Sequence, residues 1–251
     1  TFNYHVAGYG GRLVTVPYVD DREDLDGLVA AARRENAPLL YLANPDNPMG
    51  TWWEADEISR LIEALPETTM LVLDEAYGET APASAIPPLD VARPNVLRMR
   101  TFSKAYGLAG MRCGYAVGES EAIRAFDKVR DHFGMCRMTQ AAALAALADG
   151  DHLARVLGEV AASRARIAEI VGEAGLSALP SATNFVAVDC GGDGALALRV
   201  LQELIERDIF VRKPAAPRLD RCIRISAGPA AEMDALAEAF PLALAAAKAK
   251  A

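Results

Sequence analysis

The chain has 251 residues, of which 52% are hydrophobic and 24% are charged, and its formal net charge is −8 at pH 7. This length permits one large domain or a large and a small one, and the acidic balance argues against a nucleic-acid-binding surface, which needs a basic face. No apolar stretch reaches the roughly 20 residues that a membrane helix needs, and no secretory leader is visible, so we expect no contact with a membrane.

The first half of the chain alternates short apolar runs with amphipathic segments. The predicted strands span residues 12–17, 38–43, 70–74, 96–101 and 113–117. The predicted helices span residues 24–35 and 54–65, and Thr51 with Glu54 resembles a capping box at the start of the second. This alternation predicts an α/β fold with a mostly parallel sheet covered by helices, in which ligands gather beyond the carboxyl ends of the strands.

From about Glu119 the pattern changes to long helices, predicted at residues 139–148 and 151–174 and ended by Gly175. A smaller unit follows, with predicted strands at residues 184–189, 209–212 and 222–226. Its predicted helices are residues 195–207 and a last one from Ala230. We therefore expect a large α/β domain over residues 1–155 and a small C-terminal α+β domain over residues 156–251, with the boundary inside the long helix.

The cysteines show neither a CxxC pair nor a histidine spacing that is typical of zinc. They are Cys113, Cys136, Cys190 and Cys222. Two disulfides are conceivable, but in a chain of this size we expect reduced, mostly buried thiols and hence a cytoplasmic protein.

Four polar segments follow predicted strands or contain one. They are NPDNPMG (residues 44–50), DEAY (74–77), SKAYGLAGMR (103–112) and RCIRISAG (221–228). Strand ends at one edge of a parallel sheet converge, so these segments are candidates for a shared site.

Lys104 follows an apolar strand, an unusual place for an ammonium group. A lysine amine is a nucleophile only when deprotonated, and burial or a nearby cation favours that form, which suits Schiff-base chemistry. The alternative is a lysine whose stem covers apolar surface while its amine reaches water. Asp74 ends the run MLVLD and needs a partner, either a cation such as a protonated ring nitrogen or the backbone of the next turn. Glu75 beside it points the other way, and we expect it to be structural.

Five further side chains have a functional and a plainer interpretation. Tyr77 either donates a hydrogen bond to an oxyanion or is part of the core. Asn47 either belongs to the binding site or hydrogen-bonds the backbone of its own turn. Ser103 and Arg112 lie among glycines, which is typical of a phosphate site or of a small-residue turn with a surface arginine. Arg224 alternates with two isoleucines, so it either meets a carboxylate or faces solvent.

The order and spacing of these segments resemble those of fold type I pyridoxal-phosphate (PLP) aminotransferases, the aspartate aminotransferase superfamily of classes I and II. They are most similar to its histidinol-phosphate aminotransferase branch. NPDNPMG matches the NPxNPTG turn, VLDEAY the DEAY strand end and RTFSKAYGLAGMRCGY the lysine segment, while SATNFVAVD and IRISAG match strands of the small domain. The resemblance covers essentially the whole chain. It implies that an N-terminal portion of the large domain is missing from this sequence.

The resemblance also implies roles for the cofactor-binding residues. Lys104 would form the internal aldimine with PLP and act as the general acid–base, and Asp74 would pair with the pyridinium nitrogen, keeping the ring an electron sink. Asn47 and Tyr77 would hydrogen-bond the phenolate oxygen of the ring. The predicted catalytic residues are therefore Lys104, Asp74 and Tyr77.

Further roles follow from the same resemblance. Ser103 and Arg112 would bind the cofactor phosphate. Phe2 is in the position of the aromatic residue that stacks on the pyridine ring, although Tyr4 is close enough to be the alternative.

The resemblance places Arg224 and Asn184 at the substrate, with Arg224 clamping the α-carboxylate. Met49 replaces the usual threonine of the NPTG turn, and residues 131–140 are unlike the segment typical of the histidinol-phosphate branch. The substrate therefore stays open between imidazole-phosphate, aromatic and aliphatic amino compounds.

The sequence thus predicts a homodimeric PLP-dependent transaminase. It would move an amino group between an L-amino acid, or a histidinol-phosphate-like amine, and a 2-oxo acid. One alternative is a PLP-dependent amino-acid decarboxylase on the same fold. Another is the aminotransferase-like effector domain of a transcriptional regulator, although the acidic balance offers no hint of nucleic-acid contact.

Overall fold

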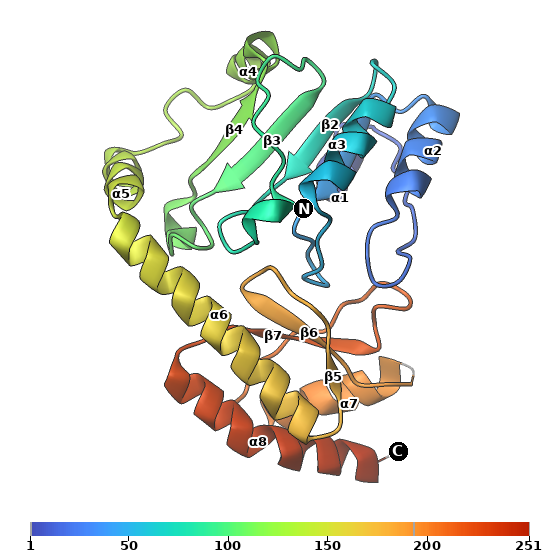
Figure 1. The fold of residues 1–251 in the computed structure, drawn as a ribbon, viewed down its shortest axis with the longest axis vertical. Coiled ribbons are helices and arrows are strands. Elements are labelled where there is room, and N and C mark those ends of the chain that lie inside the picture. The colour runs from blue at the N-terminus through green and yellow to red at the C-terminus, as the bar shows by residue number, and fades with distance from the viewer. Residues whose placement is uncertain (1, 193, 251) are drawn as a thin grey trace.

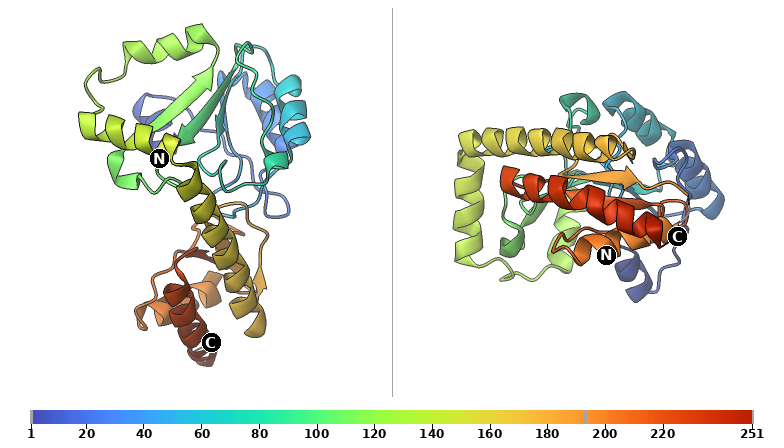
Figure 2. Two further views of the ribbon diagram at one scale, coloured as in Figure 1. Left: turned by 60° about the vertical axis from the view of Figure 1, so that its left-hand side comes forward. Right: turned by 90° about the horizontal axis from the view of Figure 1, so that it is seen from below.

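Two separate β-sheets organise the chain, one in each half of the molecule (Figure 1). The computed structural model describes residues 2–192 and 194–250. The long helix α6 (Gly150–Glu173) begins beside the first sheet and runs along the second, as the views in Figures 1 and 2 both show.

The first sheet has the order β1-β2-β3-β4. Its strands are β1 (Leu39–Ala43), β2 (Met70–Asp74), β3 (Val96–Thr101) and β4 (Gly114–Gly118). The first three are parallel, and β4 is antiparallel to β3. Ala43 pairs with Asp74 and Asp74 with Met99, so the carboxyl ends of β1, β2 and β3 lie at one edge. The predicted α/β fold with a mostly parallel sheet is confirmed.

Helices α2 (Leu25–Glu35) and α3 (Ala55–Ala64) cover one face of this sheet. The apolar side chains between helices and sheet form a buried core that includes Ala32, Leu42, Ile58, Leu61, Leu71 and Leu73. The predicted capping box was wrong in its residues. Glu54 is the N-cap and exchanges hydrogen bonds with Glu57, because α3 begins only at Ala55. Thr51 instead donates its hydroxyl to the carbonyl of Asp21.

Glu75 lies on the same face as this core, where it is held by two arginines of β3. Its carboxylate contacts Arg98 at 2.6 Å and Arg100 at 2.9 Å, and Arg100 also contacts Glu79 at 3.0 Å. A buried charge is tolerated when it is paired and hydrogen-bonded. The structural role predicted for Glu75 is confirmed.

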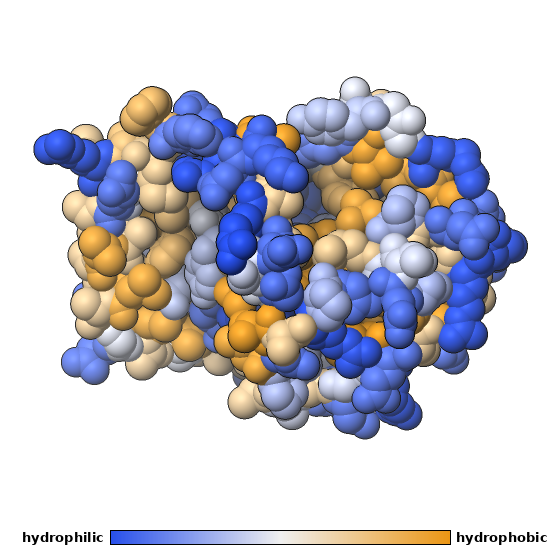
Figure 3. Space-filling model, turned by 90° about the horizontal axis from the view of Figure 1, so that it is seen from above, coloured by the Kyte–Doolittle hydropathy of each residue, from blue (hydrophilic) through white to orange (hydrophobic). Residues whose placement is uncertain are grey.

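Three further helices flank the first sheet: α1 (Phe2–Gly8), α4 (Ser120–Ala125) and α5 (Arg137–Ala148). Between α4 and the end of α5 the chain exposes a series of large apolar side chains. They are Phe126, Val129, Phe133, Met135, Met138, Leu144 and Leu147. In Figure 3, hydrophobic residues are most continuous at the left of the view, the side on which α5 lies in Figure 1, and further hydrophobic patches lie at the centre and right.

The second sheet is antiparallel and consists of β5 (Ser177–Ala178), β6 (Phe185–Asp189) and β7 (Cys222–Ser226). Helices α6, α7 (Gly194–Ile205) and α8 (Ala230–Ala249) pack on it. Their core includes Ile167, Val188, Leu204, Ile223 and Phe240, all fully buried. The predicted domain boundary at residue 155 falls within α6 and stays a prediction.

Two predicted strands were wrong. Residues 12–17 run without a strand partner among the described residues, and the nearest pairing is a single bridge between Val19 and Arg22. Residues 209–212 contribute one isolated bridge, from Arg212 to Arg224. Short apolar runs predict extended backbone, but a strand also needs a neighbour to pair with.

The two halves meet at the turn after β1. Ala182 donates its N–H to the carbonyl of Gly50 at 2.8 Å, and Gly50 has φ +82°. A Cβ at this position would lie 2.6 Å from the Ser181 hydroxyl oxygen, so glycine is required both by conformation and by space. Met49 is fully buried here against Ala187, Leu219 and Cys222 of the second half.

Arg221 adds an ionic link between the halves. Its guanidinium contacts Asp21, in the loop before α2, at 2.7 Å and Asp189, at the end of β6, at 2.8 Å. All four cysteines are free thiols, and Cys113, Cys190 and Cys222 are buried, as predicted. Within residues 2–192 and 194–250, no helix combines the length and apolar character that crossing a membrane requires.

Candidate active site

The carboxyl edge of β1, β2 and β3 carries three of the predicted polar segments. Past the strands, Asn44 donates its N–H to the carbonyl of Asp74 and Glu75 donates to that of Met99, both at 2.9 Å. These bonds extend the parallel ladder, so the turn at residues 44–50, the DEAY segment and the Lys104 loop all leave from one edge.

Tyr77 lies at the centre of the resulting cluster and is 5% exposed. The Lys104 Nζ lies 5.0 Å from the centroid of its ring. Asn47 donates from Nδ2 to its hydroxyl at 3.3 Å, and Phe185 of β6 packs edge-on at 5.5 Å. Tyr77 therefore joins side chains from both halves.

Arg224 completes this cluster from the second sheet. Its side chain faces away from Ile223 and Ile225, as predicted, and donates from Nη1 to Oδ1 of Asn47. Its guanidinium lies 4.6 Å over the Phe185 ring. Burial, with a smaller effect from the charge of Arg212, lowers the pKa of Arg224. The arginine thus contacts an amide and an aromatic face, and its role at a carboxylate stays a prediction.

Both carboxylate oxygens of Asp74 have hydrogen-bond donors. The N–H of Ala76 donates to Oδ1 at 3.0 Å, and the hydroxyl of Tyr41 donates to Oδ2 at 2.5 Å. Phe2 stacks on Tyr41 with the ring centroids 4.6 Å apart, which brings Phe2 close to Asp74, whereas Tyr4 is 85% exposed. Asp74 therefore caps its turn and has a side-chain partner as well.

The remaining predicted residues lie nearby without joining this network. Ser103 donates its N–H to the Thr101 hydroxyl at 3.0 Å, and Arg112, at φ +52°, donates to the carbonyl of Ala109. Asn184 accepts a backbone hydrogen bond from Ala227. Among the described residues, no hydrogen bond or ion pair links Ser103, Arg112 or Asn184 to the Tyr77 cluster, so their roles stay predictions.

Sequence reasoning missed two residues. Tyr41 reaches Asp74 from the neighbouring strand, 33 residues away along the chain. Arg212 pairs through its backbone with Arg224, and both strand-like hydrogen bonds of this bridge are present. The sequence showed Arg212 only as the end of a predicted strand.

The side chains around Tyr77, together with Asp74 at the same sheet edge, combine four chemical functions. Lys104 offers an amine that no acid pairs with in the described part of the chain, and Asp74 offers a carboxylate that no cation pairs with there. Tyr77 and Asn47 offer donors to an oxyanion, and Arg224 offers a guanidinium for a carboxylate. Such a set can hold a cationic aromatic ring while an amine attacks a carbonyl carbon.

Two carboxyl groups, the buried Asp46 and the half-buried Glu23, support the Asn47 turn. Asp46 is 1% exposed and accepts hydrogen bonds from the Tyr18 hydroxyl at 2.8 Å and the Met49 N–H at 3.0 Å. Its carboxyl group also hydrogen-bonds that of Glu23. Burial raises the pKa of Glu23 well above its usual value and that of Asp46 to about 6. The pair therefore favours holding at least one proton over carrying two charges.

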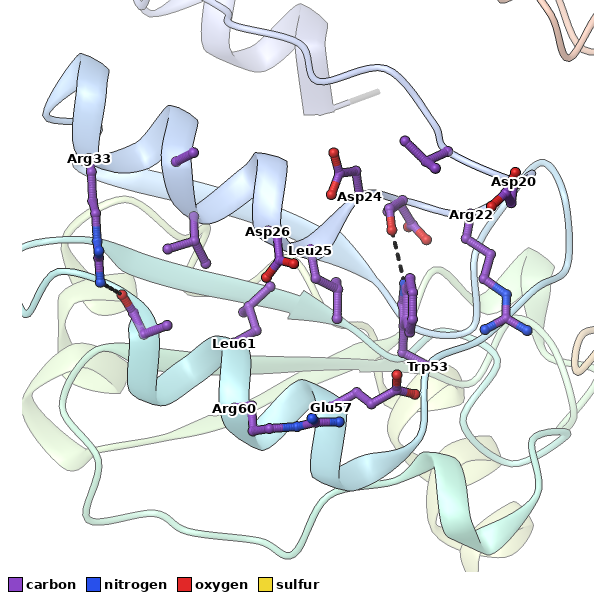
Figure 4. Close-up of a pocket in the computed structure, with 15 residues that line it drawn as sticks. Asp20, Arg22, Asp24, Leu25, Asp26, Arg33, Trp53, Glu57, Arg60 and Leu61 are labelled. Carbon is purple, nitrogen blue, oxygen red and sulfur yellow. Dashed lines mark hydrogen bonds between the residues drawn. The ribbon is translucent and has the colours of Figure 1, made fainter.

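A groove of about 800 Å³ lies elsewhere, between α2 and α3 and the loops before them (Figure 4). Trp53 lies at one end and donates from its indole N–H to the carbonyl of Glu23, with Arg22 5.1 Å from its ring centroid. None of the cluster residues lines this groove. No group of side chains in the described residues has the composition of a metal site.

Comparison with known proteins agrees with this geometry. The family model for aminotransferase class I and II matches residues 2–240. The histidinol-phosphate aminotransferase of Sinorhizobium meliloti, solved in complex with pyridoxal-5′-phosphate, has 59% sequence identity and a TM-score of 0.96 over 100% of this chain and 68% of that chain.

Curated relatives are more distant in sequence. Histidinol-phosphate aminotransferase 2 of Ralstonia nicotianae is 39% identical over 96% of this chain and 65% of its own length. The aromatic amino acid aminotransferase of Mycobacterium avium is 35% identical over 90% of this chain and 62% of its own length. The chain thus spans less than two thirds of the length of these curated relatives.

The Glu23–Asp46 pair predicts how the free energy of unfolding depends on pH. Folding raises the pKa of Asp46 to about 6 and that of Glu23 well above its usual value. Their contribution is therefore fully present below about pH 4, and the part that belongs to Asp46 is lost as the pH rises through about 6. Glu23→Gln supplies an amide donor to Asp46 without needing a proton. We expect this variant to exceed the wild type in free energy of unfolding by about 1 kcal/mol at pH 8 and to lose that advantage at pH 5.

Urea denaturation at pH 5, 6.5 and 8 measures this effect. The matched control is Glu63→Gln, which removes the same charge from an exposed position on α3. Wild-type and Glu23→Gln profiles that run parallel across this range would contradict the shared proton.

Proposed function

The chain belongs to the class I and II aminotransferase family, and we propose that the protein containing it is a PLP-dependent transaminase. It would move an amino group between an L-amino acid, or a histidinol-phosphate-like amine, and a 2-oxo acid. The observation that carries this proposal is the gathering of Lys104, Tyr77, Asn47 and Arg224 in one cluster, at the sheet edge from which Asp74 also projects.

The side chains present fit PLP. The amine of Lys104 has no competing acid, and the carboxylate of Asp74 has neutral donors but no cation, within residues 2–192 and 194–250. Phe2, stacked beside Asp74 on Tyr41, provides an aromatic surface for a flat ring. Bound PLP would supply an aldehyde for the lysine and a cationic ring that withdraws electrons from the substrate α-carbon.

Each residue would then have a defined task. The Nζ of Lys104 would bind the aldehyde and, when free, would act as the base that takes the α-proton of the substrate. Asp74 would hold the protonated ring nitrogen, and Tyr77 with Asn47 would donate to the ring oxygen. Arg224 would bind the α-carboxylate of an amino acid or the phosphate of a phosphorylated amine, with its plane set by the Phe185 ring and Asn47. Ser103 and Arg112 would bind the phosphate.

Within the possible substrates, we favour a phosphorylated amine such as histidinol phosphate. Arg212 is paired with Arg224 through the backbone, and its charge contributes to the lowered pKa of Arg224, so two guanidinium groups lie near each other. Such a pair favours a phosphate, which carries up to two negative charges and three terminal oxygens, over a carboxylate. Met49 does not argue against this choice, because its side chain is buried in the contact between the halves.

We also propose that the protein is a cytoplasmic homodimer. The apolar side chains exposed between α4 and the end of α5, such as Phe133, Met138 and Leu144, form a surface that water disfavours and a second subunit would cover. The free thiols of all four cysteines, which lie within the described residues, agree with a reducing compartment.

Replacing the lysine tests the reaction. Lys104→Ala is expected to lose the absorbance band of covalently held PLP and to lower kcat on the order of 10³-fold, because both the carbonyl attack and the proton transfer need this amine. Absorbance spectra and steady-state kinetics measure both effects, with Lys128→Ala, at an exposed lysine, as control. Near-normal turnover without Lys104 would end the assignment, and release of CO₂ by the wild type would favour a decarboxylase.

Replacing the second arginine tests the substrate. Arg212→Met is expected to raise KM for histidinol phosphate at least ten-fold while changing KM for phenylalanine by less than about three-fold, because the phosphate carries a second negative charge and a third terminal oxygen that the carboxylate lacks. The control is Arg218→Met, which removes an exposed arginine from the same loop. Equal effects of Arg212→Met on both substrates would remove the argument for a phosphorylated one.

Molar mass tests the assembly. Light scattering of the full protein is expected to give twice the mass of one chain. The double variant Met138→Glu with Leu144→Glu is expected to shift the measured molar mass toward that of one chain. A wild type that stays monomeric at micromolar concentration would contradict the homodimer.

A further inference from the structure

The hydrogen bond between Tyr41 and Asp74 crosses from one strand to the next. Tyr41 lies two residues before Ala43, and Ala43 pairs with Asp74, so the three side chains share one face of the sheet. The hydroxyl reaches Oδ2 at 2.5 Å, while the backbone N–H of Ala76 donates to Oδ1. The carboxylate is thereby fixed at both oxygens.

The surroundings of Tyr41 keep its hydroxyl a donor. Burial raises the pKa of Tyr41, and the nearby carboxyl groups of Asp74, Asp46 and Glu23 raise it further. Phe2 covers one face of the ring. A phenol that stays neutral can donate its proton to a carboxylate, and the hydroxyl of Tyr41 donates to Asp74.

We propose that Tyr41 is a positioning residue that sets the orientation and charge of Asp74 toward a bound cofactor ring. The inference rests on the proposed PLP chemistry. A donor to Oδ2 stabilises the negative charge of Asp74, and a well-stabilised carboxylate leaves the proton on the ring nitrogen. Without that donor, the proton moves toward Asp74 and the ring loses positive charge.

Tyr41→Phe tests this role, because it keeps the ring stacked on Phe2 and removes only the hydroxyl. The variant is expected to bind PLP about ten-fold more weakly. The absorbance of bound PLP changes at the pH where the nitrogen that joins Lys104 to PLP loses its proton. This pH is expected to move upward, because a less cationic ring makes that nitrogen more basic. We also expect kcat to fall more than KM changes. Titration with PLP and absorbance spectra across pH measure the first two effects, and steady-state kinetics measure the third.

The matched control is Tyr18→Phe, which removes a phenol from Asp46 in the same buried region. It is expected to leave the absorbance transition at the wild-type pH. The inference would be overturned if Tyr41→Phe kept the wild-type affinity for PLP and the wild-type pH of the absorbance transition. It would also be overturned if Tyr18→Phe shifted that pH by the same amount. Either result would leave the transaminase proposal intact. A wild type without any PLP band would instead overturn the transaminase proposal.

A second variant covers the case in which Tyr41→Phe does not fold. Incorporation of 3-fluorotyrosine at position 41 keeps the ring and makes the hydroxyl a stronger donor. The transition is then expected to move to lower pH than in the wild type, and a shift in the opposite direction would overturn the positioning role.

Discussion

The opposite orientation of two adjacent carboxylates, Asp74 and Glu75, is the constraint on which the rest of the site depends. Glu75 is fixed by Arg98 and Arg100 on the helix-covered face, and Asp74 is fixed by Tyr41 on the other. A slip of β2 by one residue would exchange the two faces, leaving one carboxylate without its arginines and the other without its phenol. Because an unpaired buried charge is costly, these partners hold the register that brings the three strand ends together.

The site is also shared between the two halves of the chain. Asn47 and Tyr77 lie in the turns that follow β1 and β2 of the first sheet, and Phe185 and Arg224 lie in β6 and β7 of the second. The turn after β1 serves both purposes, since Asn47 contacts Arg224 while Met49 and Gly50 form the packing between the halves. The substitution of methionine for the usual threonine is therefore a matter of packing between the halves.

The sequence could predict those parts of the site that depend on local pattern. Strand ends were found because apolar runs stop at polar residues, and the bounds of β2, β3 and β7 agree with the prediction. The contact between Tyr41 and Asp74 could not be found this way, because it depends on the register of two strands. The failed strand at residues 12–17 has the same origin, since local pattern shows extended backbone but does not supply a partner.

The placement of Arg221 has a mechanical consequence. This residue joins Asp21 and Asp189 and lies three residues before Arg224, a separation of about 10 Å along extended backbone. If the second half tilted about the ion pairs of Arg221, the guanidinium of Arg224 would lie close to the axis of the tilt. A tilt of roughly 5° would displace that group by only about 1 Å over this separation. Such a tilt would therefore displace the Arg224 guanidinium less than it displaces parts of the second half that lie farther from Arg221.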